Sequence, residues 1–184
     1  MPNAILDPTG RTPVPREPVT TPRAARRRDL AGARIGLLDN TKHNADLLLA
    51  EIGKLLVGEH GAAAVTLART KQAFALPAPD ELVAEFAERC DVVVTGVGDC
   101  GSCSASAVAD GVLFEAAGVP AAVICTDAFI TTADAMAQLR GAPGYAYLTT
   151  PHPVAVLDSG QVADRAKELV AGVVALLTEP GAGA

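Results

Sequence analysis

Two cysteines, Cys100 and Cys103, stand two residues apart in the stretch TGVGDCGSCSAS, which directly follows the apolar run DVVV. A cysteine thiolate is a nucleophile, and a second thiol close to it can resolve the bond that forms. The three glycines around Cys100 allow close approach of the backbone to a ligand, and Ser102 or Ser104 is expected to cap the helix that follows. The spacing therefore indicates a reactive thiol pair in a strand-to-helix loop.

Other interpretations of the same residues remain open. Zinc could be held by Cys100, Cys103, Cys125 and His152, although no second closely spaced ligand pair supports such a site. A glycine-rich loop of this kind also occurs in phosphate sites and in structural turns without cysteine chemistry. We favour the thiol pair, and we expect no metal and no organic cofactor. Cys90 is interpreted as a small buried apolar residue.

The elements that position these residues follow from hydrophobic periodicity. Short apolar runs predict strands at 34–38, 63–68, 91–96, 121–125 and 145–150. Helical spacing predicts helices at about 45–58, 80–90, 104–117, 131–140 and 160–178. Such alternation implies parallel strands with crossover helices. We therefore predict an α/β domain of the Rossmann or flavodoxin-like three-layer type, with a mainly parallel sheet and helices on both faces.

Ligands of a parallel sheet bind outside the carboxyl ends of its strands, so the residues that follow each apolar run should converge. Cys100 is expected to attack the substrate and Cys103 to resolve the adduct, while His152, between two prolines, would act as acid, base or partner of an anion. A loop salt bridge between Asp39 and Lys42 is the alternative to a substrate role for that pair. The residues expected to bind substrate are Asp39, Asn40, Lys42, Asp99, Ser102, Thr126 and Asp127.

The chain divides into three segments by composition. Residues 1–33 contain six of the thirteen prolines and the run RAARRRD, which predicts an extended arm. Residues 34–178 form the single predicted domain, and residues 179–184 resemble a flexible tail. A chain of 184 residues with 49% hydrophobic residues has ample material for one core.

Charge and composition exclude several classes of partner. The net charge is −6, and residues 1–34 carry a local +4, which leaves about −10 on the remainder. An acidic body repels polyphosphates, and 3% aromatic residues cannot form a base-stacking surface, so we expect no nucleic-acid partner. No signal peptide or membrane-spanning run is evident. We expect a cytoplasmic protein whose four cysteines are not a structural disulfide framework.

The motif TGVGDCGSC resembles the signature of the UGSC family, whose selenoprotein members carry selenocysteine at the position of Cys100. The opening AILDPTGR is also similar to that family. More remotely, the order of CGSC, GVP, the strand ending in Cys125 and Thr126, and PHP is similar to the selenocysteine-bearing subunits of the glycine and proline reductases. The resemblance implies a soft nucleophile at Cys100, because selenium replaces sulfur where such chemistry is needed.

Three functions are compatible with this pattern. The first is a thiol-dependent oxidoreductase that reduces or reductively cleaves a small molecule, with a thiol reductant or a second enzyme subunit as partner. The second is a lyase, dehydratase or isomerase that uses Cys100 and Cys125 as acid and base without a cofactor. The third is a non-catalytic or zinc-holding subunit of a larger complex. We favour the first, and we expect a homo-oligomer.

Overall fold

The computed structural model describes residues 21 and 23–179, which contain one five-stranded sheet of order β2-β1-β3-β4-β5. All paired neighbours are parallel. The strands are β1 (Arg34–Asp39), β2 (Ala64–Thr70), β3 (Val92–Gly98), β4 (Ala121–Thr126) and β5 (Leu148–Thr150). This strand order is the flavodoxin-like form of the doubly wound α/β fold, so the predicted fold class is confirmed.

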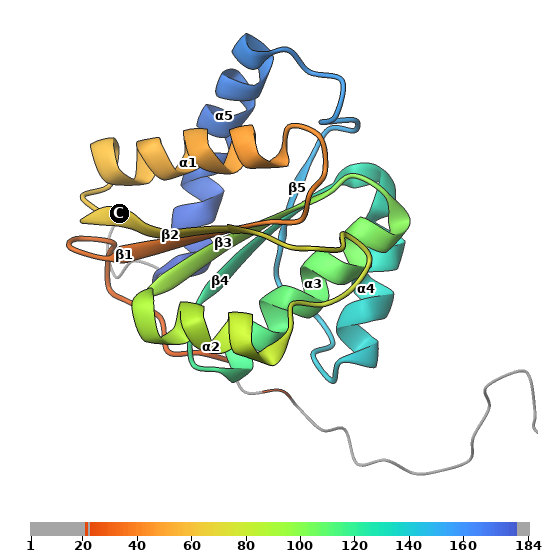
Figure 1. The fold of residues 1–184 in the computed structure, drawn as a ribbon, viewed down its shortest axis with the longest axis horizontal. Helices are drawn as coiled ribbons and strands as arrows, with labels where there is room; N and C mark the ends of the chain where they lie inside the picture. Colours follow the sequence, from red (N-terminus) through yellow and green to blue (C-terminus); the bar gives the residue numbers. More distant parts are fainter. Residues whose placement is uncertain (1–20, 22, 180–184) are drawn as a thin grey trace, which may run out of the picture.

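Helices cover both faces of this sheet (Figure 1). Helices α1 (Ala45–Glu59) and α5 (Ser159–Leu177) pack against each other on one face. Helices α2 (Asp80–Arg89), α3 (Gly101–Ala116) and α4 (Ile130–Leu139) cover the other, and the short helix η1 (Asp127–Phe129) precedes α4. Every crossover thus returns the chain to the amino-terminal edge of the sheet before the next strand begins. The loops that follow the strands therefore lie together at the opposite, carboxyl-terminal edge.

The central strand β3 positions the candidate site. Its sequence VVVTGVG is buried at all seven positions, which is typical of a parallel strand covered on both faces. Strand β3 pairs with β1 on one side and with β4 on the other. The stretch that contains Cys100 therefore leaves the sheet from its middle and continues directly into α3.

Helix α3 begins earlier than the sequence predicted. It starts at Gly101 and not near Ser104, because the side chain of Cys100, and not of a serine, caps it by accepting the backbone N–H of Cys103 at 3.3 Å. The strand predicted at 145–150 is shorter, since Tyr145 N donates to Ala142 O in a turn before β5. The apolar face predicted for the last helix is confirmed, with Val162, Ala166, Leu169, Val170, Val173 and Leu177 all buried.

The described part of the predicted arm packs on the body. Arg27 forms a parallel bridge with Thr178, and Leu30 and Ala33 belong to the core beneath α1 and α5. Arg26 forms an ion pair with the buried Glu115 at 2.7 Å. The rest of the arm, residues 1–20 and 22, and residues 180–184 of the predicted tail lie outside the described residues.

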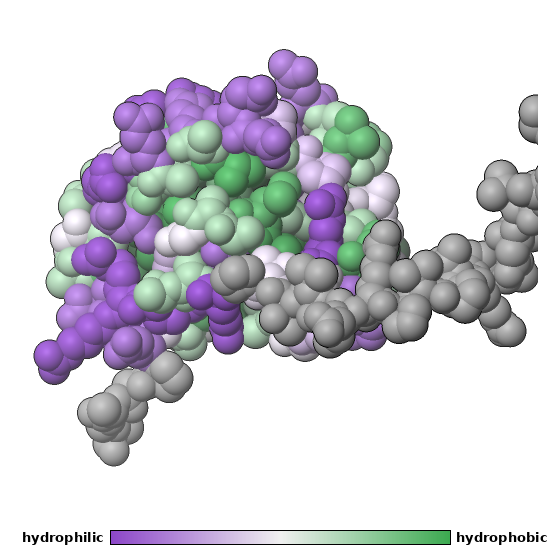
Figure 2. All heavy atoms as spheres, turned by 90° about the horizontal axis from the view of Figure 1, so that it is seen from below, coloured by the Kyte–Doolittle hydropathy of each residue, from purple (hydrophilic) through white to green (hydrophobic). Residues whose placement is uncertain are grey.

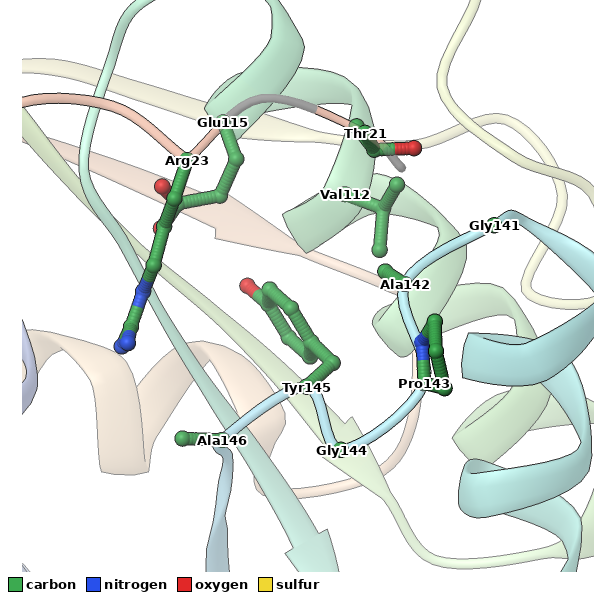
Figure 3. A pocket seen from close by; sticks show the side chains of 10 residues that line it. All are labelled: Thr21, Arg23, Val112, Glu115, Gly141, Ala142, Pro143, Gly144, Tyr145 and Ala146. Carbon is green, nitrogen blue, oxygen red and sulfur yellow. The ribbon is translucent and has the colours of Figure 1, made fainter. Parts of the chain in front are cut away.

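The surface of the molecule carries two further features. Figure 2, seen from below, shows an apolar area bordered by polar side chains. At the amino-terminal edge of β5 lies a cavity of about 270 Å³, which Figure 3 shows with Arg23, Glu115 and Tyr145 around it. This cavity is at the sheet edge opposite to the cysteine loop, because its lining comes from the end of α3 and from residues 141–146 before β5.

Candidate active site

The two motif cysteines form a pair at the amino-terminal end of α3. Cys100 is the N-cap residue and Cys103 lies in the first turn, and their sulfur atoms are at disulfide distance. Cys100 is partly exposed, whereas Cys103 is buried, with 1% of its surface accessible. One sulfur is therefore accessible to a substrate, and the other can be reached only through the first.

The local environment of Cys100 favours a thiolate. Its sulfur accepts a backbone N–H of α3 and lies at the positive end of a 16-residue helix, and both effects stabilise a negative charge. The exposed hydroxyl of Ser102 lies 3.5 Å from the same sulfur. Ser102 thus lies beside Cys100, and its predicted role in substrate binding stays a prediction.

A glycine allows α3 to approach the sheet this closely. A β-carbon on Gly98 would lie 2.6 Å from Ser104 Oγ and 2.7 Å from Cys125 Sγ. Contacts this short would force the first turn of α3 away from β3 and β4. Gly98 is therefore required by packing, and the position of the cysteine pair depends on it.

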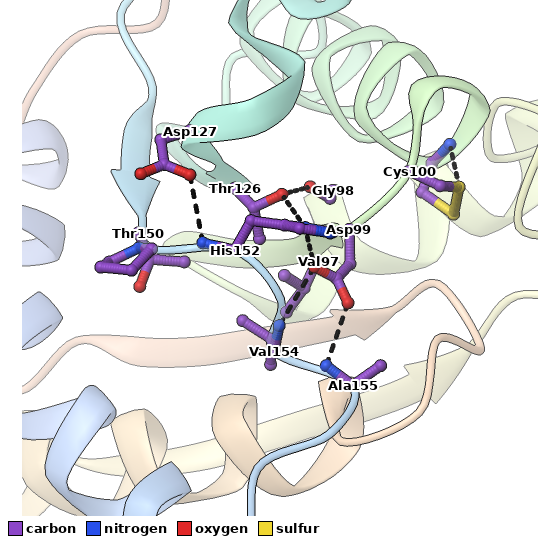
Figure 4. A network of polar contacts seen from close by, with 12 residues as sticks. Val97, Gly98, Asp99, Cys100, Thr126, Asp127, Thr150, His152, Val154 and Ala155 are labelled. Atoms are coloured by element: carbon purple, nitrogen blue, oxygen red, sulfur yellow. Dashed lines mark hydrogen bonds and ion pairs between the residues drawn. A yellow bond between two sulfur atoms is a disulfide. The ribbon is translucent and has the colours of Figure 1, made fainter.

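A second group of polar residues surrounds His152, in the loop after β5 (Figure 4). Its Nδ1 lies 2.9 Å from Asp99 Oδ1 and 3.2 Å from Thr126 Oγ1. Its backbone N–H donates to Asp127 Oδ1 at 3.1 Å, and the ring packs edge-on against Phe129 with a centroid distance of 5.3 Å. Loops after β3, β4 and β5 thus converge on one imidazole.

Asp99 is buried, and both of its carboxylate oxygens contact this loop. Its two oxygens accept the backbone N–H groups of Val154 at 3.1 Å and Ala155 at 3.0 Å, in addition to the His152 contact. Both carboxylate oxygens are thus engaged within the protein. We reassign Asp99 from substrate binding, as predicted from the sequence, to positioning the loop that carries His152.

Asn40 also has a different role from the one predicted. It is fully buried, its amide Nδ2 donates to Val97 O at 2.8 Å, and its Oδ1 accepts Val97 N–H at 3.1 Å. These two bonds fasten the end of β1 to the end of β3, and the full burial of the side chain keeps Asn40 out of reach of a substrate in solvent. We reassign it to positioning.

Asp39 and Lys42 lie at the same carboxyl edge of the sheet as the cysteine pair. They line a separate shallow hollow, together with Thr70 from the end of β2. Asp39 accepts the backbone N–H of Thr41 at 2.8 Å, and its partial burial raises the pKa of its carboxyl. No salt bridge joins Asp39 and Lys42 among the described residues. A substrate role for both stays a prediction.

Cys125 is not accessible in this structure. It is fully buried near the end of β4, and burial raises the pKa of its thiol to about 12. Its environment therefore offers no support for the scheme in which Cys100 and Cys125 act as acid and base. Within residues 21 and 23–179 no group of three or more histidine, cysteine or acidic side chains is arranged to hold a metal, so the zinc alternative gains no support either.

A buried charged cluster next to the site was missed in the sequence. Lys71 Nζ donates to Asp110 Oδ2 at 2.6 Å, to Ser106 Oγ at 2.6 Å and to Leu76 O at 2.8 Å. Ala78 N donates to Asp110 Oδ1, which fixes the loop after β2 against α3. The available signal was an acidic residue, Asp110, in the middle of a helix that is otherwise apolar or small up to Glu115 near its end.

Comparison with known proteins places the chain in a family. The model of the UGSC family matches residues 4–179, and the chain belongs to this family. This confirms the resemblance that the motif around Cys100 suggested. No curated protein matches the chain. Among solved structures, a flavodoxin-like domain from Synechococcus sp. is similar, with 19% sequence identity and a TM-score of 0.38; the match covers 75% of this chain and 91% of that chain.

No helix in the described part of the chain is long and apolar enough to cross a membrane.

Proposed function

We propose that this protein is a thiol-dependent enzyme that reduces or reductively cleaves a small molecule, with Cys100 as the nucleophile and Cys103 as the resolving thiol. The observation that carries the proposal is the asymmetry of the pair: an accessible sulfur at a helix N-terminus lies at disulfide distance from a buried one. Such a pair can store and release two electrons without a bound cofactor.

The reaction can be written so that atoms and electrons balance. The Cys100 thiolate attacks group R of a substrate R–Y, the S–R bond forms, and Y leaves with the bonding electrons and takes up a proton. The Cys103 thiolate then attacks Cys100 Sγ, the disulfide forms, and R leaves with the S–R electrons and is protonated. R must therefore be a sulfur group or a carbon that a neighbouring carbonyl group stabilises as a carbanion. The dithiol is oxidised, and R–Y is reduced to R–H and H–Y.

A thiol reductant must then reduce the disulfide before the next turnover. The partner that we propose is a dithiol reductant or a second enzyme subunit, and a reducing compartment such as the cytoplasm would supply it. The order of CGSC, GVP and PHP in the sequence, if it reflects kinship with the reductase subunits it resembles, would imply the same direction of electron flow. A homo-oligomer remains our expectation, and sedimentation velocity of the purified protein measures it.

The substrate class is tested by incubating the protein with a metabolite pool, with and without dithiothreitol, and identifying consumed compounds by mass spectrometry. We expect consumption only with the dithiol, with one equivalent of dithiol oxidised for each substrate molecule. Turnover that oxidises no dithiol would indicate a lyase or isomerase. No turnover by the chain alone, with activity restored by a second protein, would indicate a subunit of a complex.

The division of labour between the thiols is tested with two variants and a control. Cys100→Ser should abolish turnover, because an alkoxide is far less accessible than a thiolate at neutral pH. Cys103→Ser should accumulate a substrate adduct on Cys100, visible as added mass on the intact protein. Cys90→Ser, far from the pair in the core between β1 and α2, should behave as wild type. Full activity of Cys103→Ser without an adduct would contradict the resolving role.

A further inference from the structure

The hydrogen bonds around His152 determine which of its ring nitrogens carries the proton. Thr126 Oγ1 donates its only hydrogen to the carbonyl oxygen of Gly98 at 3.0 Å. Toward His152 Nδ1, at 3.2 Å, the same hydroxyl can therefore act only as an acceptor. The second neighbour of Nδ1 is a carboxylate oxygen of Asp99 at 2.9 Å, which is also an acceptor when ionised.

Both neighbours of Nδ1 thus require it to be an N–H donor. In the neutral imidazole the lone pair must then reside on Nε2, since a neutral ring carries one proton. The opposite tautomer would place a lone pair against the lone pairs of Asp99 and Thr126. Free histidine in water prefers that opposite tautomer, with the proton on Nε2, so the protein reverses the intrinsic preference.

Because Nδ1 is engaged by Asp99 and Thr126, Nε2 is the ring nitrogen that is left for proton transfer. Asp99 is 1% exposed at its side chain, whereas the side chain of His152 is 36% exposed. The backbone of His152 is held by Asp127, and Phe129 packs against the ring edge-on. Position, rotation and tautomer of the imidazole are therefore all determined by contacts from β3, β4 and the loops that follow them.

We propose that Asp99 and Thr126 are positioning residues that present Nε2 of His152 as the proton acceptor of the site. This inference rests on the function proposed above and assigns the proton transfers in it. The proton that the Cys100 thiol releases to solvent on forming the thiolate is matched by one that Nε2 takes up from solvent, and Asp99 stabilises the resulting imidazolium. The imidazolium then donates that proton to the leaving atom Y of R–Y, so His152 ends the step neutral.

The assignment also restricts the substrate. A proton delivered to Y is useful only where Y is a heteroatom that would otherwise leave as an anion, such as an oxygen, nitrogen or sulfur. Asp99 precedes Cys100 in the chain, so the residue that orients the base and the nucleophile itself are fixed to the same end of β3. The substrate class we infer is a small molecule with such a heteroatom leaving group.

The tautomer is measurable without any substrate. We would record long-range ¹H–¹⁵N correlation spectra of protein labelled with ¹⁵N-histidine, at a pH where the imidazoles are neutral. The signals of His152 are assigned by their loss in His152→Gln. We expect a protonated Nδ1 and an unprotonated Nε2 for His152 in the wild-type protein. A protonated Nε2 in the wild-type protein would overturn the proposal, and this outcome needs no variant to fold.

Variants show whether the two acceptors cause the tautomer. Asp99→Asn should shift the population of His152 toward the form protonated on Nε2, because the amide cannot supply acceptors to the ring and to both backbone N–H groups. Thr126→Val should shift it in the same direction to a smaller extent, whereas Thr126→Ser, which keeps the hydroxyl, should not. An unchanged tautomer in both Asp99→Asn and Thr126→Val would refute the positioning role.

Once a substrate is known, Asp99→Asn should lower kcat with little change in KM, because Asp99 touches His152 and not the substrate. Different measurements test the role of His152 and the thiol mechanism, so one can be wrong while the other holds. A protonated Nε2 removes the base but leaves the Cys100 adduct of Cys103→Ser intact, whereas a missing adduct removes the thiol mechanism and leaves the tautomer of His152 as measured.

Discussion

At the scale of single residues, burial divides the four thiols of the chain into distinct kinds. Cys90 and Cys125 are buried among apolar side chains, and burial raises the pKa of both, that of Cys125 to about 12. Cys100 is partly exposed and accepts a hydrogen bond at a helix N-terminus, while Cys103 is buried directly beneath it. Reactivity should follow this order, because the thiolate is the reactive form and must be reachable.

Limited alkylation of the reduced protein tests this order. With iodoacetamide at neutral pH, Cys100 should be modified well before Cys90, and Cys125 should remain unmodified, since a raised pKa keeps a thiol protonated at that pH. Peptide mass spectrometry measures the extent at each site, and all four cysteines should react after denaturation. Equal modification of Cys100 and Cys90 in the native protein would show that accessibility and helix capping do not set the reactivity.

His152→Ala should reduce turnover without abolishing it. General acid–base assistance is typically worth about 10²- to 10⁴-fold in rate, and the thiol attack itself survives. The loss should therefore be smaller than that of Cys100→Ser, measured as kcat with saturating dithiol. A variant as inactive as Cys100→Ser would instead indicate that the loop after β5 collapses, which a changed far-ultraviolet circular dichroism or lowered Tm would reveal.

At the scale of elements, the site depends on how closely α3 approaches β3 and β4. The first turn of α3 lies over Gly98, where a β-carbon would meet Ser104 and Cys125. Lys71 and Asp110 fasten the loop after β2 to the same helix. Asn40 joins β1 to β3. The cysteine pair is therefore positioned by contacts on several sides, and not by its own loop alone.

Gly98→Ala tests the close approach. Overpacking of this kind typically costs about 1–3 kcal/mol, so the free energy of unfolding in urea should fall by that order. The matched control is Gly58→Ala, at an exposed position of α1 with open space around it, where alanine should be neutral or stabilise by about 0.5–1 kcal/mol. A Gly98→Ala protein as stable as wild type would mean that α3 can shift at little cost.

At the scale of the whole molecule, the segment before β1 is joined to the domain through a buried carboxylate. Glu115, at the end of α3, accepts hydrogen bonds from Ala24 N at 2.8 Å, from Ala121 N at 3.1 Å and from the guanidinium of Arg26 at 2.7 and 2.9 Å. Arg27 and Thr178 bring the segment beside the end of α5. The two ends of the described chain are thereby fastened to one edge of the sheet.

Arg26→Ala should destabilise the whole domain, because it leaves the buried carboxylate of Glu115 without its charged partner. Breaking a buried ion pair typically costs about 3–5 kcal/mol, and since Arg26 is partly accessible we expect a value at or below the lower end. Arg28→Ala, at an exposed neighbouring position, should change the free energy of unfolding by less than about 0.5 kcal/mol. Equal stability of the two variants would contradict the anchoring role.

The sequence by itself determined the alternation of strands and helices, the parallel sheet and the edge of the sheet at which the candidate site residues lie. These features follow from local periodicity and from the handedness of crossovers, both of which are visible in a single chain. The resemblance of TGVGDCGSC to the UGSC family was equally local, and the family match confirmed it. That Ser102 lies beside Cys100 is also set locally, by three consecutive residues, and its role in substrate binding stays a prediction.

Only the tertiary structure decided what the other polar residues do. Asp99 reaches Val154 across 55 positions of sequence, and Asn40 reaches Val97 across 57. Periodicity carries no information about such partners, so a polar residue at a strand end looks the same whether it faces a substrate or a backbone N–H. Burial of Cys125 and the tautomer of His152 depend likewise on groups brought together by folding, because hydrogen-bond direction and solvent access belong to an arrangement in space and not to a residue type.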